Sequence, residues 1–279
     1  MKIAQIQSHV YPTTAENLEA LSQVLNRLRP EKCDVVTLGE MFTCPYSTEL
    51  FPSFAEKELG ETWTALSKFA KEFGIILFAG SVPELDDHGR IYNTAYAFDR
   101  DGRQIAKHRK MHLFDIDVEN GQKFKESEVL SPGNECTLAN TEFGKIGLCI
   151  CFDFRFPELA RLMVQKGAKM IVVPAAFNMT TGPAHWEIMF RSRAVDNQCF
   201  VAGTSVARNK AEGYVAWGHS LLVSPWGDVI QEMDEKPGYI VNDIDLEYAD
   251  RIRRELPLLS ARRRDLYILE EIDKGRTHK

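Results

Sequence analysis

The sequence lacks a long apolar run and an excess of positive charge. A membrane-spanning helix needs about 20 consecutive apolar residues, and no window of the 279 residues approaches that length. Lys and Arg number 34 against 40 Asp and Glu, a formal net charge of −6. Nucleic acids and anionic membranes both favour basic surfaces, so neither is the expected partner. Residues 1–7 also lack the basic and then apolar pattern of a secretory signal, so we expect a cytoplasmic protein.

The cysteines lack the paired spacing of structural zinc sites. There are six of them: Cys33, Cys44, Cys136, Cys149, Cys151 and Cys199. In a reducing compartment we expect free thiols, each either a small buried side chain or a reactive group. The chain has no phosphate-binding Gly-rich loop, no low-complexity segment and no internal repeat. A glutamine-fed synthetase that uses ATP is therefore not expected.

Strand-like and helix-like patterns alternate along the whole chain. Residues 15–28 and 63–73 carry apolar positions at helical spacing, and turn residues predict hairpins around 99–102 and 225–228. A charged helical tail is expected after the last strand. Mixed strands, helices and hairpins without a linker predict one layered α/β sandwich. Further strands are expected at 3–7, 35–38, 75–79, 145–150, 170–173, 200–204 and 240–244, and further helices at 157–166 and 185–197.

Cys151 stands at a predicted strand-to-helix junction. The apolar strand 145–150 leads into it, and a helix begins near Pro157, a favoured first-turn residue. Backbone N–H groups at such a turn can stabilise a developing oxyanion. A thiol with a pKa of about 8.5 needs a base or a cation to become a nucleophile. Two alternatives stay open: Cys149 and Cys151 can both be core residues of the strand, or they can form a reversible disulfide.

Two other segments offer the base and the cation. Glu40 follows the short apolar strand 35–38, and α/β folds collect site residues where such strands end. Lys110 lies in 108–115, which mixes charged and apolar residues. Taken alone, Glu40 can equally be a surface glutamate, and 108–115 can equally be a solvated loop. His108 and His112 can also pair with the cysteine, or serve as metal ligands four residues apart, although no third ligand is evident.

Taken together, three segments resemble the signature blocks of the nitrilase (carbon–nitrogen hydrolase) superfamily. They are 39–42, 108–115 and 151–158, and the resemblance covers nearly the whole chain. The segment 176–187 is similar to the omega-amidase branch. One departure is Phe152, where the family more often has Tyr, and this change keeps the backbone N–H. The resemblance implies a single-domain, four-layer α-β-β-α sandwich over residues 1–279. It also implies a homodimer or higher homo-oligomer in which the tail, residues 246–279, reaches a neighbouring subunit.

The resemblance further implies a cysteine amidase that needs no metal or organic cofactor. Its substrates are small 2-oxo dicarboxylic monoamides such as 2-oxoglutaramate, hydrolysed through a thioester. The implied catalytic residues are Glu40 as base, Cys151 as nucleophile, Lys110 and the Phe152 backbone N–H at the oxyanion, and Glu126 beside them. The implied substrate-binding residues are Arg155, Thr181 and Phe177.

Alternatives remain for the substrate and for Arg155. A guanidinium binds a carboxylate bidentately, but Arg155 can instead pair with Asp153 or Glu158. The same chemistry can act on deaminated glutathione, an N-carbamoyl compound or a nitrile. A non-catalytic scaffold with this fold is also possible, although a scaffold has no need of an intact Glu, Lys and Cys.

Overall fold

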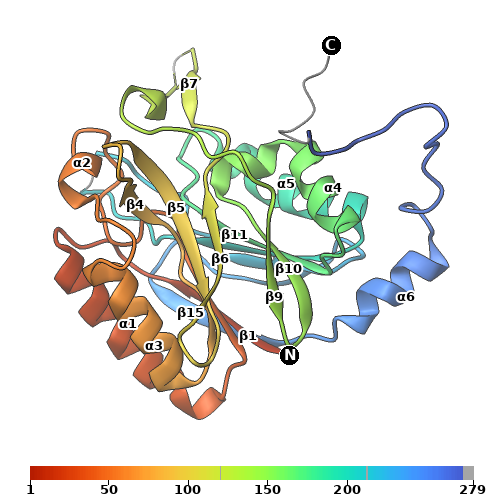
Figure 1. The fold of residues 1–279 in the computed structure, drawn as a ribbon, viewed down its shortest axis with the longest axis horizontal. Coiled ribbons are helices and arrows are strands. Elements are labelled where there is room, and N and C mark those ends of the chain that lie inside the picture. The colour runs from red at the N-terminus through yellow and green to blue at the C-terminus, as the bar shows by residue number, and fades with distance from the viewer. Residues whose placement is uncertain (120, 212, 273–279) are drawn as a thin grey trace.

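Two β-sheets stacked face to face form the centre of the molecule, and helices cover the outer face of each sheet (Figure 1). The computed structural model describes residues 1–119, 121–211 and 213–272. The first sheet contains, in spatial order, β15 (Gly238–Asp243), β1 (Lys2–Gln7), β2 (Val35–Leu38), β3 (Ile76–Phe78), β5 (Ile91–Phe98) and β4 (Val82–Leu85), and β6 (Gln104–Arg109) also pairs with β5. The second contains β14 (Val229–Glu232), β13 (Leu221–Val223), β12 (Phe200–Ser205), β11 (Met170–Ala175), β10 (Gly144–Leu148) and β9 (Thr137–Thr141).

Strand β1 shows why the two sheets stack. Ile3 joins the core between the sheets, whereas Ala4 and Ile6 pack on the other face with helix residues. Successive side chains of a strand point to opposite faces, and here both faces are buried, so every residue of the strand after Lys2 is buried. Gln5 and Gln7 are the buried polar residues of the strand. The amide nitrogen of Gln5 donates to the carbonyls of Gly203 and Leu221 in the second sheet, both at 3.0 Å, and so ties the two sheets together.

The outer layers are helices that each bury one face. Helices α1 (Thr14–Leu28) and α3 (Glu61–Phe73) cover the first sheet, and α4 (Pro157–Gln165) and α5 (Gly182–Asn197) cover the second (Figure 1). Helix α1 starts with a capping box, in which Thr13 and Glu16 satisfy each other's backbone N–H groups. The expected four-layer α-β-β-α sandwich is therefore confirmed.

The connections bring several strand ends to one place. Strands β1, β2 and β3 run parallel to one another, as do β10, β11 and β12. The backbone N–H of Glu40, just beyond β2, donates to the carbonyl of Ala175 at the end of β11, at 3.4 Å. The carboxyl ends of strands from both sheets thus lie against each other, and site residues gather at such ends in α/β folds.

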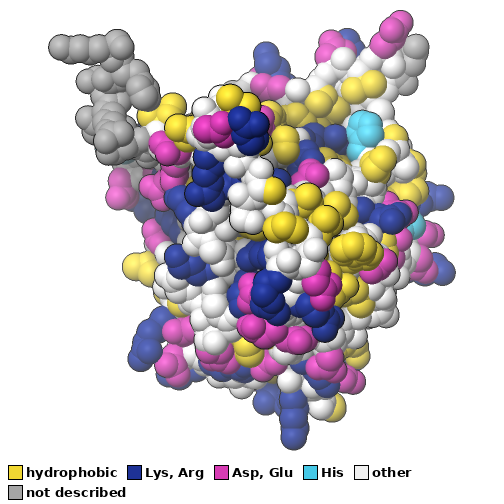
Figure 2. Space-filling model, turned by 90° about the vertical axis from the view of Figure 1, so that its right-hand side faces the viewer, with side chains coloured by type: hydrophobic (Ala, Val, Ile, Leu, Met, Phe, Trp, Pro, Cys, Tyr) yellow, Lys and Arg dark blue, Asp and Glu magenta, His cyan; other side chains and the backbone are white. Residues whose placement is uncertain are grey.

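Smaller elements complete the chain. They are α2 (Phe51–Phe54), α6 (Glu247–Glu255), the paired strands β7 (Asp115–Asp117) and β8 (Lys123–Lys125), and the 3₁₀ turns η1 (Arg29–Glu31), η2 (Glu126–Glu128) and η3 (Cys151–Arg155). Sequence patterns did not predict β4, β7, β8 or β9. Among the described residues, no helix combines the length and the apolar character needed to cross a membrane. Basic and acidic side chains lie interspersed on the face drawn in Figure 2.

The charged tail expected after the last strand is helical only in its first part. Helix α6 ends at Glu255, and residues 256–272 form turns, bends and irregular backbone without a helix. Pro257 explains the stop, since a proline disfavours helical backbone in the residue before it. Leu256 has φ −129° and ψ 86°, outside the helical region. Residues 273–279 of the expected tail lie outside the described residues.

Candidate active site

Four of the predicted catalytic side chains meet between the two sheets. Glu40 follows β2, Lys110 follows β6, Cys151 opens η3 and Glu126 opens η2. Glu40, Lys110 and Glu126 are fully buried, and Cys151 is 6% exposed. Buried charges persist only when they are paired and hydrogen-bonded, so the arrangement of partners decides what this cluster can do.

Lys110 lies between the two carboxylates. Its Nζ donates to Glu40 Oε1 at 2.8 Å and to Glu126 Oε1 at 3.0 Å. Burial alone disfavours the ammonium, but Glu126 and Glu40 outweigh burial and raise the pKa of Lys110. Lys110 is therefore a fixed positive charge, held in place by two negative ones.

Tyr46 also belongs to this cluster, although no sequence pattern pointed to it. Its hydroxyl lies 2.5 Å from Glu126 Oε1 and 3.1 Å from Glu40 Oε1. Its ring stacks on Tyr214, with centroids 4.5 Å apart. A tyrosine in an irregular loop carries no signal in the sequence. The sequence shows only that Tyr46 lies six residues after Glu40.

The two oxygens of Glu40 have different surroundings. Oε1 accepts hydrogen bonds from Lys110, from Tyr46 and from the Asn93 side chain, the last at 2.8 Å. Oε2 is buried and has no hydrogen-bond partner among the described residues. One oxygen is thus saturated, and the other is left to accept a proton.

Burial and the neighbouring charges set the protonation of Glu40 and Cys151. Burial raises the pKa of Glu40 above its ordinary 4.5, with Lys110 opposing this rise and Glu126 adding to it. Burial also raises the pKa of Cys151 well above its usual value, and the charge of Glu40 adds to that rise. The thiol is therefore protonated at rest, beside a carboxylate that can take the proton.

Cys151 sits on a strained turn. Its φ is +44°, and that of Met41, which follows Glu40, is +49°. Left-handed backbone costs a non-glycine residue about 1–2 kcal/mol, and such strain clusters at functional sites. The Ala176 backbone N–H, just beyond β11, lowers the pKa of Cys151 against the rise that burial causes. Cys151 thus lies on a strained turn beside the end of a neighbouring strand.

Arg155 does not form the expected ion pair with Asp153 or Glu158. No carboxylate among the described residues pairs with it. Its guanidinium lies 4.7 Å from the centre of the Phe177 ring and 5.7 Å from that of Phe152, and its NH1 lies 3.1 Å from His185 Nδ1. Burial lowers its pKa. A partly buried guanidinium without a carboxylate partner is suited to bind an anion.

The remaining predicted residues lie at strand and helix ends. Phe177 is buried just after β11, and its ring packs against Trp186, with centroids 5.0 Å apart. Thr181 precedes α5, and its hydroxyl donates to Asn178 Oδ1 at 2.9 Å. Asn178 is another residue that the sequence did not suggest. Its buried side-chain nitrogen has no hydrogen-bond partner among the described residues.

His108 and His112 do not contact the thiol. A ring nitrogen of each donates to the Asp153 carboxylate, at 2.9 Å and 2.8 Å. Within the described part of the chain, no group of three or more His, Cys, Asp or Glu residues is arranged to hold a metal ion. The histidines are therefore engaged with a carboxylate and do not act as the base for Cys151.

Comparisons with known proteins cover nearly the whole chain. Residues 2–254 match the Carbon-nitrogen hydrolase family. The chain is 48% identical over 270 residues to omega-amidase NIT2 of Xenopus tropicalis, covering 97% of this chain and 98% of that protein. It is 44% identical over 269 residues to omega-amidase NIT2 of Homo sapiens, covering 96% and 97%. The crystal structure of Saccharomyces cerevisiae Nit3, a member of branch 10 of the nitrilase superfamily, is similar with a TM-score of 0.87 and 40% identity, over 94% of this chain and 96% of that one.

Proposed function

The chain belongs to the carbon–nitrogen hydrolase family, and we propose that it is an omega-amidase. It would release ammonia from the side-chain amide of small 2-oxo dicarboxylic monoamides such as 2-oxoglutaramate. The superfamily resemblance of the three motifs is confirmed by the family match. The observation that carries the proposal is the 48% identity over 97% of this chain to a protein named omega-amidase. The buried cluster of Glu40, Lys110, Glu126 and Cys151 agrees with it.

The proposed reaction begins with a proton transfer from Cys151 to Glu40. The thiolate attacks the amide carbon and forms a tetrahedral oxyanion, which the Lys110 ammonium and the Phe152 backbone N–H stabilise. Glu40 returns the proton to the amide nitrogen and the C–N bond breaks. Ammonia leaves, and the acyl group remains bound to Cys151 as a thioester. Glu40 then takes a proton from water, and the hydroxide attacks the thioester. The C–S bond breaks, the acid leaves, and Glu40 returns its proton to the Cys151 sulfur.

The surroundings of Glu40 support its role as the base in both half-reactions. Its Oε2 has no hydrogen-bond partner among the described residues, so this oxygen can receive a proton without breaking the bonds at Oε1. Lys110 favours the ionised carboxylate, while burial and Glu126 oppose ionisation. A base whose pKa is raised toward the working pH transfers protons efficiently in both directions. Glu126 and Tyr46 would hold the side chains of Lys110 and Glu40 in place.

Arg155 would bind the far carboxylate of the substrate. It lies close enough to Cys151 for the charge of the thiolate to favour the guanidinium, and it has no carboxylate partner among the described residues. Phe177 lies under the guanidinium and would form one wall of the pocket. Thr181 would supply a second polar contact, for which its hydroxyl must share or leave its bond to Asn178.

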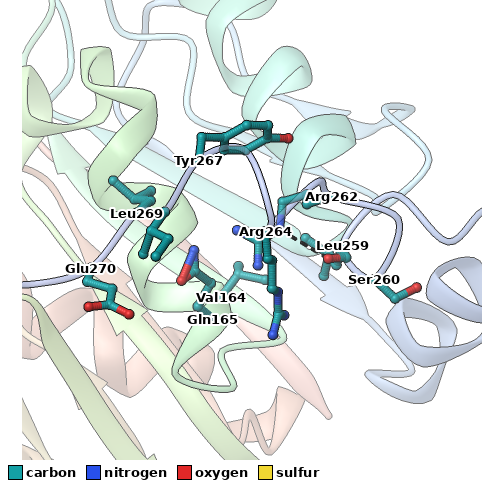
Figure 3. A pocket seen from close by; sticks show the side chains of 10 residues that line it. Val164, Gln165, Leu259, Ser260, Arg262, Arg264, Tyr267, Leu269 and Glu270 are labelled. Atoms are coloured by element: carbon teal, nitrogen blue, oxygen red, sulfur yellow. Dashed lines mark hydrogen bonds between the residues drawn. The ribbon is translucent and has the colours of Figure 1, made fainter.

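The proposal includes a homodimer or higher homo-oligomer, with the tail from residue 246 onward at an interface. The described tail lies over α4 and lines a cavity of about 510 Å³ (Figure 3). Leu266 and Ile268 are 69% and 73% exposed. Apolar side chains exposed in this way gain by burial against another subunit. A cytoplasmic location and a single domain over 1–279 stay predictions from the sequence.

Ammonia release from 2-oxoglutaramate by the purified protein, beside a Cys151→Ala control, tests the proposal. Turnover that disappears in the control would support both the nucleophile and the substrate class. Rapid alkylation of Cys151 without turnover would keep the hydrolase and discard this substrate, leaving deaminated glutathione, N-carbamoyl compounds and nitriles to be assayed. An inert thiol together with no turnover on any of these would favour a non-catalytic scaffold.

A further inference from the structure

We propose that Asp153 is a positioning residue that locks the segment carrying Lys110 to the turn carrying Cys151. The inference rests on the proposed function and deepens it. Asp153 is fully buried, two residues after Cys151. None of its hydrogen bonds reaches Cys151, Glu40 or Lys110, so it acts through the backbone and side chains around them.

The Asp153 carboxylate accepts five hydrogen bonds from two separate segments. Oδ1 accepts from the backbone N–H of Met111 at 3.1 Å, and from the backbone and ring nitrogens of His112, both at 2.8 Å. Oδ2 lies 2.9 Å from His108 Nε2 and accepts from the Ile150 backbone N–H at 3.1 Å. The donors therefore flank Lys110 on both sides and Cys151 on its N-terminal side.

Alternation along β6 explains why His108 reaches this carboxylate. His108 lies on one face of the strand and is buried, whereas Lys107 and Arg109 lie on the other face and bind Glu84. Lys110 follows with its side chain on the His108 face, since successive residues alternate. Asp153 therefore holds the face of this segment that carries the proposed oxyanion-stabilising cation.

Several further contacts fix the same arrangement. The Lys110 backbone N–H donates to the Asn93 carbonyl at 2.8 Å, and its carbonyl accepts from Gly133 at 2.8 Å. The His112 ring stacks on Phe156, with centroids 3.7 Å apart. Hydrogen bonds from His108 and His112 outweigh burial and hold the pKa of Asp153 well below its usual range. The carboxylate thus stays ionised and keeps accepting all five bonds.

Positioning matters because the reaction depends on the distance between Lys110 and the sulfur-bound oxyanion. A misplacement of about 1 Å can lower a rate about 100-fold. Asp153→Asn keeps the size of the side chain but replaces one acceptor oxygen with a donor, so part of the network must open. Lys110 would then move away from Glu40. The titratable groups that face Glu40 are Lys110, Glu126, Cys151, Tyr46 and Tyr214.

The test compares Asp153→Asn with Glu84→Gln, which disturbs a buried carboxylate of β4 that binds Lys107 and Arg109 on the opposite face of β6. We expect Asp153→Asn to lower kcat about 10- to 100-fold with little change in KM, as for residues that orient reacting groups. The acidic limb of the kcat/KM profile should move to higher pH, because the pKa of Glu40 rises when Lys110 withdraws. Simple loss of the Asp153 charge would move that limb the opposite way. Glu84→Gln should lower the Tm without changing kcat or the limb.

A second variant covers the case in which Asp153→Asn does not fold. His112→Phe keeps the stacking on Phe156 but removes the ring hydrogen bond to Asp153, so it should shift the limb in the same direction by less. A lower Tm in both variants with kcat and the limb unchanged would reduce Asp153 to a structural role and overturn the proposal.

The pH dependence of Cys151 alkylation by iodoacetamide separates this proposal from the proposed function. It reports the ionisation of the Cys151–Glu40 pair and needs no substrate. If the wild-type protein does not hydrolyse 2-oxoglutaramate but Asp153→Asn still shifts the alkylation profile to higher pH, the positioning role stands and only the substrate is wrong. An unshifted alkylation profile overturns the positioning role whatever the substrate.

Discussion

The asymmetry of Glu40 decides how the site can use a carboxylate as a base. Three donors hold Oε1, while Oε2 is buried without a hydrogen-bond partner among the described residues. The charge of Lys110 and the desolvation of the carboxylate act in opposite directions on its pKa. The result is a group whose position is fixed and whose proton can still move.

The first prediction concerns pH. The folded-state pKa of Glu40 is raised above 4.5, so the base is lost as pH falls through that raised value. We expect the acidic limb of kcat/KM for 2-oxoglutaramate to lie above pH 4.5, the ordinary value for a glutamate. A profile measured in buffers of constant ionic strength checks this. A limb at or below that pH would mean that another group supplies the base.

The second prediction concerns Lys110→Met, which leaves Glu40 and Glu126 as two buried carboxylates without a cation. Breaking a buried ion pair by removing one partner costs about 3–5 kcal/mol, and the oxyanion loses a donor worth about 100-fold or more in kcat. In the folded state the two carboxylates would then share a proton, and this proton is released when the protein unfolds. Stability relative to the wild type should therefore recover as pH falls from neutral toward 5.

Urea unfolding at two pH values measures this recovery. Lys107→Met is the matched control, because Lys107 also binds a buried carboxylate, Glu84, but lies outside the site. Its loss of stability should not be accompanied by a loss of kcat. Equal destabilisation of Lys110→Met at both pH values would contradict the shared-proton account.

At the scale of elements, the strand ends determine where the chemistry lies. The turn after β2 is tightly packed beneath Glu40. A Cβ at Gly80, where φ is +61°, would lie 2.2 Å from the Gly39 carbonyl oxygen. Gly39 itself packs against the backbone of Ser205 and Val206. Two glycines therefore let the end of β2 approach its neighbours closely enough to present Glu40 to the site.

The third prediction uses this contact. Gly80→Ala should displace the Gly39 carbonyl and with it Glu40, so we expect both a lower Tm and a lower kcat. Gly89→Ala is the control, since Gly89 also has positive φ, +77°, but has nothing within 4 Å of the added Cβ. Gly89→Ala should cost only the backbone strain of about 1–2 kcal/mol and leave kcat unchanged. Equal effects in the two variants would show that contact with Gly39 is unimportant.

At the scale of the whole molecule, the C-terminal segment, residues 256–272, has no buried residue. It lies over α4, where Arg262 and Tyr267 help line a cavity (Figure 3). The backbone N–H of Cys136 donates to Glu271, and Lys166 forms an ion pair with the same carboxylate. The segment is thus anchored by polar contacts, while several apolar side chains point to solvent.

The fourth prediction concerns assembly. The double variant Leu266→Asp, Ile268→Asp places two charges where side chains are 69% and 73% exposed. If the tail packs against another subunit, burying these charges is unfavourable, and the variant should have a lower molar mass in light scattering after size exclusion. Leu59→Asp, at a site 67% exposed, is the control and should not change the mass. Unchanged mass in an oligomeric protein would place the interface elsewhere.

The sequence by itself determined most of the elements and the identity of the central residues. Apolar periodicity is local, so helices such as α1 and α3 and strands such as β2 could be read from spacing alone. Glu40, Lys110 and Cys151 each follow a predicted strand inside a recognisable segment. Strands β7 and β9 were not predicted because polar residues make up most of each, and the charged tail is helical only as far as Glu255 because Pro257 follows.

Only the tertiary structure decided which groups complete the site. Tyr46 and Glu126 are 80 positions apart, and Lys110 and Glu40 are 70 apart, so no local pattern records either contact. The structure also assigned His108 and His112 to Asp153 and left Arg155 without a carboxylate partner among the described residues. Hydrogen-bond partners depend on distances of a few ångströms. Those distances exist only once the two sheets have packed together and the ends of their strands have met.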